Sequence, residues 1–258
     1  MSWSKDTTKL LLSLSYDGSG YAGWIIQPHQ QTIQGALNQA IKKVTKTTDF
    51  KTLGASKTDA GVHALDQKVV LTCAFQPQNL ERFQHALNKA LPKDLHIQNI
   101  EVVDTDFNLH QMVQEKTYRY TLSESWVLNQ QRYSLLWHGR KLVADELQRL
   151  AQVFIGHHNF QNFCGLSQAE IAQQPQATWR EIKNITVEHH GSQISFLIQG
   201  PTFIRYQIRM IVGAILAVYE GKKYQAADLS KFLENPQVQK FPKVAPSEGL
   251  CLEKIILK

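Results

Sequence analysis

Hydrophobic and polar residues alternate with two different periods along this 258-residue chain, and these periods predict its strands and helices. Residues 10–16 alternate loosely and run into Asp17-Gly18, which is typical of a strand that ends in a turn. Residues 32–44 place apolar side chains at helical spacing, and Thr32 is suited to cap that helix. The first part of the chain therefore predicts a β-α-β-β-α-β order, in which the remaining elements are strands at 52–55, 68–75 and 97–103 and a helix at 79–91.

The later part of the chain repeats this order. It begins with a Thr- and Tyr-rich strand and contains a hairpin around Gly191-Ser192. Two such units predict an α/β protein of the α+β type, with ferredoxin-like halves at 1–105 and 106–258 and a mainly antiparallel sheet with helices on one face. Periodicity alone leaves open whether the two sheets join. The expected elements are strands at 116–123, 183–190, 193–199 and 249–257 and helices at 145–155, 203–219 and 226–234.

Composition narrows the class of protein. Lysine and arginine outnumber aspartate and glutamate by 28 to 22, which permits a polyanionic partner without requiring one. Apolar runs are too short to span a membrane, and the N-terminus lacks the apolar core of a signal peptide. The three cysteines are far apart and show no zinc spacing or disulfide framework, so we expect a cytoplasmic protein without a metal.

Residues 18–23 match the G-x-G-x-x-G pattern of dinucleotide-binding proteins and follow a strand. That pattern must open directly into a helix whose N-terminus faces the pyrophosphate. Here the predicted helix begins only at Thr32, so these glycines are expected to form a tight loop. The adjacent histidines at 157–158 and 189–190 should point to opposite sides of their elements, which disfavours a shared metal.

The segment at residues 55–64, Ala-Ser-Lys-Thr-Asp-Ala-Gly-Val-His-Ala, carries the strongest candidate chemistry. Asp59 lies among small residues, which let a bulky substrate approach, and Gly61 can adopt a positive φ. Lys57 can attract a phosphate or keep the carboxylate ionised. The alternative is an ordinary polar turn, because Thr, Asp and Gly all favour turns.

This segment resembles the Arg-Thr-Asp-Ala-Gly-Val-His-Ala motif of the tRNA pseudouridine synthase A family. Four other segments agree with that family in order and spacing, so the resemblance extends from about residue 10 to residue 257. They are Tyr16-Asp17-Gly18 with Gly23-Trp24, Lys116-Thr117-Tyr118-Arg119-Tyr120, Ile208-Arg209-Met210-Ile211-Val212-Gly213, and Ala245-Pro246-Ser247-Glu248-Gly249-Leu250.

The resemblance implies that the two halves share a sheet with a central cleft and that the protein isomerises uridine to pseudouridine without a cofactor. Asp59 would be the catalytic carboxylate, either as a nucleophile or as a base that removes a ribose proton. Arg209 would be its ion-pair partner, and burial of an unpaired Arg on so apolar a helix would be costly. Tyr118 would contact the target base, and Leu250 would pack over it.

Two positions that would bind substrate depart from the family pattern. Lys57 replaces an arginine thought to insert where the uridine leaves its stack, so the charge is kept and the planar stacking surface is lost. Arg205 stands where the bacterial pattern often has a histidine. At residues 107–110, Phe-Asn-Leu-His replaces the usual Phe-His-Ala-Arg, so a cation is reduced to a mostly neutral histidine.

The resemblance thus implies a homodimeric tRNA pseudouridine synthase that acts on positions 38–40 of the anticodon arm, and the cysteine pattern favours a cytoplasmic location. Two alternatives remain open. One is an RNA-binding homologue with weak or no catalysis, which the changes at Lys57 and residues 108–110 suggest. The other is a pseudouridine synthase that acts on another RNA.

Overall fold

The computed structural model describes residues 7–235 and 239–258, and the chain divides into two compact units. The N-terminal unit extends to Gln114 and also includes Leu252–Lys258, whereas the C-terminal unit is Glu115–Cys251. Strands β5 (Val113–Ser123) and β11 (Leu250–Leu257) each have residues in both units. The chain therefore passes between the units within strands and not through a loop.

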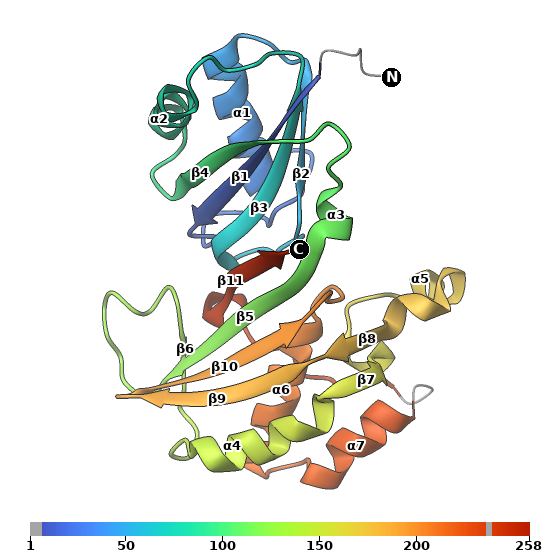
Figure 1. Cartoon of the computed structure of the whole chain (residues 1–258). Coiled ribbons are helices and arrows are strands. Elements are labelled where there is room, and N and C mark those ends of the chain that lie inside the picture. The colour runs from blue at the N-terminus through green and yellow to red at the C-terminus, as the bar shows by residue number, and fades with distance from the viewer. Residues whose placement is uncertain (1–6, 236–238) are drawn as a thin grey trace. The chain divides into compact units, whose positions relative to one another are not determined.

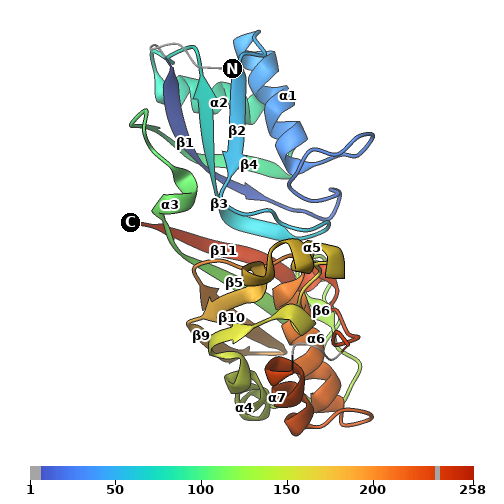
Figure 2. The same ribbon diagram turned by 90° about the vertical axis from the view of Figure 1, so that its right-hand side faces the viewer.

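The N-terminal unit is a mainly antiparallel sheet with the helices α1 and α2 and the short helix α3 (Figure 1). Strand β1 lies between β4 and β3, and β3 also neighbours β2 and β11. Helices α1 and α2 contact each other and cover one face of the sheet (Figure 2). The predicted β-α-β-β-α-β order is confirmed by β1 (Thr8–Tyr16), α1 (Ile33–Thr45), β2 (Phe50–Gly54), β3 (His63–Cys73), α2 (Leu80–Ala90) and β4 (Leu95–Val103), which the short helix α3 (Leu109–Met112) follows.

Side-chain caps fix where the two long helices of this unit begin. Thr32 Oγ1 accepts a hydrogen bond from the Gly35 amide at 3.2 Å, which confirms the predicted N-cap of α1. Asn79 Oδ1 accepts from the Arg82 amide at 2.8 Å and caps α2 in the same way. Of the six apolar residues that its spacing places on one face, helix α1 buries Ile33, Leu37, Ala40 and Ile41, whereas Ala36 and Val44 are half-buried.

Strand β3 begins five residues before the predicted start at residue 68 and ends two residues before the predicted end. Residues His63–Gln67 contain no β-branched residue, so propensity gives no sign of a strand there. Residues 63–67 are part of the strand because they pair with β1, where Ala64 lies opposite Tyr16 and Gln67 lies opposite Leu14. The extension carries the strand directly back to the Asp59 loop.

The C-terminal unit contains a second antiparallel arrangement, with β10 between β5 and β9. Helix α4 packs against β9 and against α6, and α7 contacts α6 (Figure 1). A separate pair, β7 and β8, lies outside this sheet, and β6 adds a short parallel pairing to β5. The unit comprises β6 (Leu135–Leu136), α4 (Ala144–Ala151), β7 (Gly156–Asn159), α5 (Gln168–Gln173), β8 (Trp179–Ile182), β9 (Asn184–His190), β10 (Gln193–Gly200), α6 (Gln207–Glu220) and α7 (Ala226–Glu234), with 3-10 turns at Gln152–Phe154, Gln161–Phe163, Pro175–Thr178 and Ser247–Gly249.

Two predicted helices of this unit have the wrong ends. Helix α6 begins at Gln207 and not at residue 203, because Tyr206 adopts a left-handed conformation with φ of 63° and cannot continue a helix. The helix predicted over residues 145–155 ends at Ala151 and tightens into a 3-10 turn up to Phe154. The elements β6, β7, β8 and α5 were not predicted, since none is longer than six residues.

Within the described residues, no helix is long and apolar enough to cross a membrane. In the same ranges, no three His, Cys, Asp or Glu side chains lie close enough together to hold a metal ion. The ring of His157 stacks on Trp179 at 5.3 Å, and His158 Nε2 contacts the Ile155 carbonyl oxygen at 2.9 Å. These two neighbouring histidines therefore have separate partners.

Candidate active-site loop and its partners

The Asp59 loop connects β2 to β3, and backbone hydrogen bonds hold it along its length. The Ala55 amide donates to the Lys68 carbonyl at 2.8 Å, and the Trp24 amide donates to the Thr58 carbonyl at 3.0 Å. Gly61 has φ of 77°, as the sequence predicted, and its amide donates to the Tyr21 carbonyl at 3.1 Å. The loop is thus attached to β3 on one side and to the segment after β1 on the other.

Two of the three glycines of the G-x-G-x-x-G pattern, Gly18 and Gly23, pack against this loop. A side chain at Gly18 would overlap the Val62 carbonyl oxygen, and a Cβ at Gly23 would lie 2.8 Å from the Thr58 carbonyl oxygen. The Gly18 amide also donates to Nδ1 of the buried His63 at 3.1 Å. Helix α1 begins at Ile33, well past Gly23. Gly18 and Gly23 therefore allow close packing on the Asp59 loop, and the late start of α1 agrees with the rejection of a dinucleotide site.

Alternate residues of the loop face in different directions. Ser56 and Thr58 are buried, whereas Lys57 is exposed and Asp59 is half-buried. Burial thus alternates along residues 56–59, a segment without regular secondary structure. The loop consequently presents Lys57 and Asp59 from a backbone that is anchored through their neighbours.

Tyr118 lies on β5 in the C-terminal unit, opposite Ile198 of β10. Its side chain is only 6% exposed, and its ring meets that of Phe203 edge-to-face with a centroid separation of 5.4 Å and an interplanar angle of 87°. Edge-to-face contacts of this kind fix ring orientation. The ring of Tyr118 therefore has a fixed orientation beside Phe203, which lies in the turn between β10 and α6.

Arg209 lies in the first turn of α6 and is tied to the segment that precedes β11. Its Nε donates to the Ala245 carbonyl at 2.7 Å, and the Ala245 amide donates back to the Arg209 carbonyl at 2.9 Å. A Cβ at Gly213 would lie 2.9 Å from the Ala245 nitrogen, so a glycine is needed for this close approach. The guanidinium carbon of Arg209 also lies 5.2 Å from the ring centroid of Tyr206.

Leu250 begins β11 and is 4% exposed. The segment that leads to it packs closely on Tyr120, whose hydroxyl donates to the Pro246 carbonyl at 2.9 Å. A Cβ at Gly249 would lie 2.7 Å from the Tyr120 ring. Burial, with a smaller contribution from the charge of Glu248, raises the pKa of Tyr120 well above its usual range, so the hydroxyl stays a donor.

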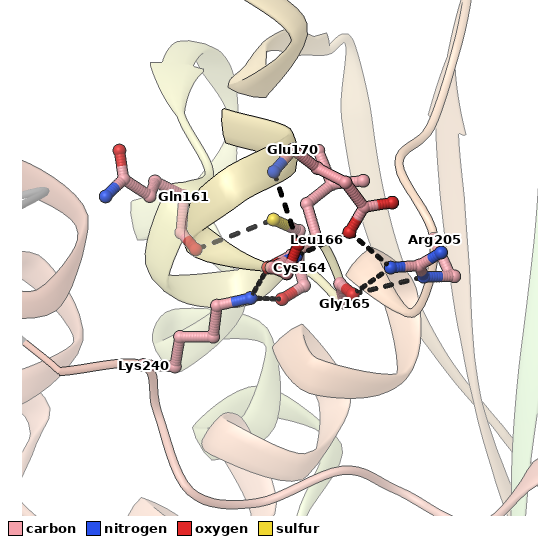
Figure 3. A network of polar contacts seen from close by, with 8 residues as sticks. Gln161, Cys164, Gly165, Leu166, Glu170, Arg205 and Lys240 are labelled. Atoms are coloured by element: carbon pink, nitrogen blue, oxygen red, sulfur yellow. Dashed lines mark hydrogen bonds and ion pairs between the residues drawn. The ribbon is translucent and has the colours of Figure 1, made fainter. Parts of the chain in front are cut away.

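Arg205 is held by two partners within the C-terminal unit (Figure 3). Its guanidinium donates to the Gly165 carbonyl and forms an ion pair with Glu170 at 2.9 Å, while the Gly165 amide donates to the Arg205 carbonyl at 2.7 Å. Hydrogen bonds from Ser167, together with Arg205, lower the pKa of Glu170 to about 2. The Arg205 side chain is still 46% exposed, so one of its faces remains accessible.

Lys240 approaches the same short loop and donates to the carbonyls of Cys164 and Leu166 (Figure 3). Consecutive carbonyls at residues 164–166 are thus bound by Lys240 and Arg205. The neighbouring Cys164 thiol is buried, and this burial raises its pKa, although nearby cations partly oppose the effect. A thiol in this state is a weak nucleophile.

Residues 108 and 110, where the sequence departs from the family pattern, lie in or next to the short helix α3, a few residues before the buried Lys116 of β5. Asn108 is the N-cap of α3, and its side chain accepts a hydrogen bond from the Gln111 amide. The asparagine therefore has a structural role where the family usually has a histidine. His110 in the same helix is exposed. Lys116, which precedes Tyr118, is buried, and burial lowers its pKa to about 8.

The structure thus groups the predicted residues within each unit. Lys57 and Asp59 share one loop in the N-terminal unit, and Arg205 and Arg209 flank Tyr206 in the C-terminal unit. Sequence reasoning missed Gln67, which is fully buried and binds the Asp59 loop. A signal was available, because a polar residue at 67 shares the inward phase of β3 with Val69, Leu71 and Cys73.

Comparison with known proteins assigns a family to this arrangement. The family described as tRNA pseudouridine synthase matches residues 13–110 and 150–256, so the chain belongs to that family. The first matched segment contains Asp59, and the second contains Arg205, Arg209 and Leu250. Tyr118 lies between the two segments.

Full-length relatives agree with this assignment. A protein named tRNA pseudouridine synthase A from Mesoplasma florum is 43% identical over 251 residues, which cover 97% of this chain and 99% of the relative. The protein of the same name from Mycoplasma mycoides subsp. mycoides is 42% identical over 96% of this chain and 97% of its own length. A more distant relative from Caldicellulosiruptor bescii, also named tRNA pseudouridine synthase A, is 32% identical over 96% and 98%.

Proposed function

We propose that this protein is an isomerase that converts uridine to pseudouridine at positions 38–40 in the anticodon arm of tRNA. The observation that carries the proposal is the position of Asp59 in a chain of this family. The carboxylate is half-buried on a loop whose adjacent side chains are anchored inward, so it is presented from a fixed backbone.

The reaction exchanges one bond to ribose for another. The bond between C1′ and uracil N1 breaks, the base turns, and C1′ bonds to C5, which loses its proton while N1 gains one. Nothing is oxidised or reduced, so the proposal includes no redox cofactor and no metal. Asp59 supplies the carboxylate, either by covalent attack or by removal of a ribose proton.

The other predicted site residues act on the substrate or on Asp59. Arg209 is the proposed ion-pair partner of Asp59, and its tie to Ala245 restricts its orientation. Tyr118 and Leu250 would contact the flipped base, because an unstacked base regains energy against aromatic and apolar surfaces. Lys57 and Arg205 would meet phosphates, and both have exposed side chains.

The wider proposal keeps the expected organisation of the protein. Residues 1–105 form the half with the catalytic loop, and residues 106–258 form the other half. The enzyme acts as a homodimer in the cytoplasm. An excess of 28 basic over 22 acidic residues supports a polyanionic substrate such as tRNA.

Replacing Asp59 by asparagine tests the proposal, because it keeps the shape and removes the charge. We expect Asp59→Asn to abolish tritium release from tRNA labelled at uridine C5, with tRNA affinity and melting temperature nearly unchanged. Asp49→Asn, the same chemical change at an exposed position of the same unit, should be fully active. Substantial activity in Asp59→Asn would refute the assignment.

Mapping the modified positions in the tRNA separates the proposed substrate from other RNAs. Wild-type protein that binds tRNA without releasing tritium from any RNA would favour the alternative of a binding protein with weak or no catalysis. Modification confined to another RNA, or to tRNA positions other than 38–40, would overturn the proposed specificity and leave the reaction class intact.

A further inference from the structure

The side chain of Gln67 continues the pairing of β2 with β3 into the Asp59 loop. Regular pairing of the two strands ends at Gly54, which lies opposite Val69. Two residues later, the Ser56 amide donates to Gln67 Oε1 at 3.0 Å, and Gln67 Nε2 donates to the Ser56 carbonyl at 2.7 Å. The side-chain amide therefore binds Ser56 through the pair of bonds that a neighbouring strand would provide.

A second connection runs from the same amide to the residue next to Asp59. Gln67 Nε2 lies 3.4 Å from the Tyr16 hydroxyl, and that hydroxyl lies 2.8 Å from Thr58 Oγ1. Tyr16, Ser56 and Thr58 are at most 7% exposed, and Gln67 is fully buried. Since buried hydrogen bonds have no competing water, these contacts restrict the loop strongly.

We infer that Gln67 is a positioning residue for Asp59, acting through Ser56 and through Tyr16 and Thr58. This inference rests on the proposed function. These contacts, here called the brace, hold the buried residues Ser56 and Thr58, whereas Lys57 is exposed and Asp59 is half-buried. Small displacements of a catalytic group cost rate more than they cost binding, so the brace should act on the chemical step.

Only an amide satisfies both sets of contacts. A glutamate at position 67 would keep the shape but could not donate to the Ser56 carbonyl or to Tyr16. A methionine would keep the length and lose all the bonds. Gln67→Met and Gln67→Glu should each lower the single-turnover rate at saturating tRNA by about 10- to 100-fold, with the Kd for tRNA within about twofold of wild type.

Helix α2 supplies a matched control. Asn88 makes the same two-bond pairing with the backbone of Ile97, at 2.9 Å and 2.8 Å, in the N-terminal unit but away from the loop. Asn88→Leu should therefore lower the melting temperature without slowing the single-turnover rate of the folded protein. A rate loss in Asn88→Leu as large as that in Gln67→Met would show that the effect is general destabilisation, and would overturn the inference.

The contact between the hydroxyls of Tyr16 and Thr58 provides a second test, which applies even if Gln67→Met fails to fold. Thr58→Val removes the oxygen that meets Tyr16 and keeps the shape, whereas Thr58→Ser keeps the oxygen and removes a methyl group. A positioning role predicts a slow Thr58→Val and a nearly normal Thr58→Ser. The reverse order, or equal rates for both, would mean that packing alone matters and would overturn the inference.

Wild type and Asp59→Asn are measured in the same assay to separate the two hypotheses. If wild type releases no tritium, the proposed function fails. If wild type is active and Asp59→Asn is inactive while the Gln67 and Thr58→Val variants match wild type in rate, only the positioning inference fails.

Discussion

Neutral hydrogen bonds hold the Asp59 loop, whereas charged groups hold the turn before α6. In the first region, a buried glutamine and buried hydroxyls bind the backbone around Asp59. In the second, Arg205 and Lys240 bind the carbonyls at residues 164–166, and Arg205 is paired with Glu170. This protein therefore holds its candidate catalytic residues through two sets of contacts, one neutral and one charged, which differ in their sensitivity to pH and salt.

The degree of burial explains why one set of contacts is neutral and the other is charged. A neutral amide can be fully buried when each of its polar atoms is bonded, as in Gln67. An ion pair at the surface costs less desolvation but is screened by salt, and the Arg205 and Glu170 side chains are 46% and 44% exposed. We therefore expect the contacts of Gln67 to be insensitive to acid and salt, whereas the Arg205–Glu170 pair should weaken in high salt and below about pH 4.5.

The largest effect should come from a steric clash with the backbone at the end of the Asp59 loop. Gly18→Ala would force a new Cβ onto the Val62 carbonyl oxygen, which cannot move without shifting the loop. We expect a loss of about 3 kcal/mol in the free energy of unfolding, measured by urea titration, and a slower single-turnover rate. Gly20→Ala is the control, because a Cβ there would meet nothing within 4 Å. Equal stabilities of the two variants would contradict the close packing.

The next largest effect should come from a buried cation, Lys116 of β5, which lies opposite Gly200 at the end of β10, just before the turn that leads to α6. Burial lowers the pKa of Lys116 from 10.5 to about 8, so between these values the unfolded chain binds more protons than the folded one. The free energy of unfolding should therefore rise with pH from 8 to 10.5, by up to about 3 kcal/mol. Lys116→Met should lack this rise. Urea titrations of both proteins at pH 7, 8, 9 and 10 measure it, and parallel profiles would contradict the prediction.

Gly165→Ala should be milder than Gly18→Ala because its new Cβ would meet a side chain. That Cβ would overlap the ring of Tyr206, which can rotate away only by disturbing its contact with Arg209. We expect a loss of about 1–2 kcal/mol in the free energy of unfolding. The single-turnover rate of the folded variant should also fall below that of wild type. A normal rate would show that the placement of Tyr206 does not matter for activity.

The smallest effect concerns the surface ion pair. Because the pKa of Glu170 is lowered to about 2, its contribution to stability is fully present above the unfolded value of 4.5 and is lost as the pH falls toward 2. The difference in melting temperature between wild type and Glu170→Gln should be small at pH 7, constant down to about pH 5, and absent near pH 2. High salt should reduce it at pH 7. A difference independent of both pH and salt would show that the pair does not act through charge.

Local sequence patterns determined most of the elements of this protein. Helical spacing and a threonine cap predicted α1, and its N-cap residue and four of the six residues on its apolar face are as predicted. The β-α-β-β-α-β order of the N-terminal unit also followed from periodicity, because period-2 and period-3.6 patterns are local properties. The family motif likewise located Asp59, since that motif is a contiguous run of residues.

Tertiary structure decided what the local pattern could not express. Strand β3 extends to His63 only because β1 lies opposite it, and α6 begins late because Tyr206 turns left-handed beside Gly165. The brace from Gln67 to Ser56 joins residues eleven positions apart, and the bond from Tyr16 to Thr58 spans forty-two. Such contacts depend on which strands become neighbours, which is settled by packing of the whole unit and not by the spacing of residues along one segment.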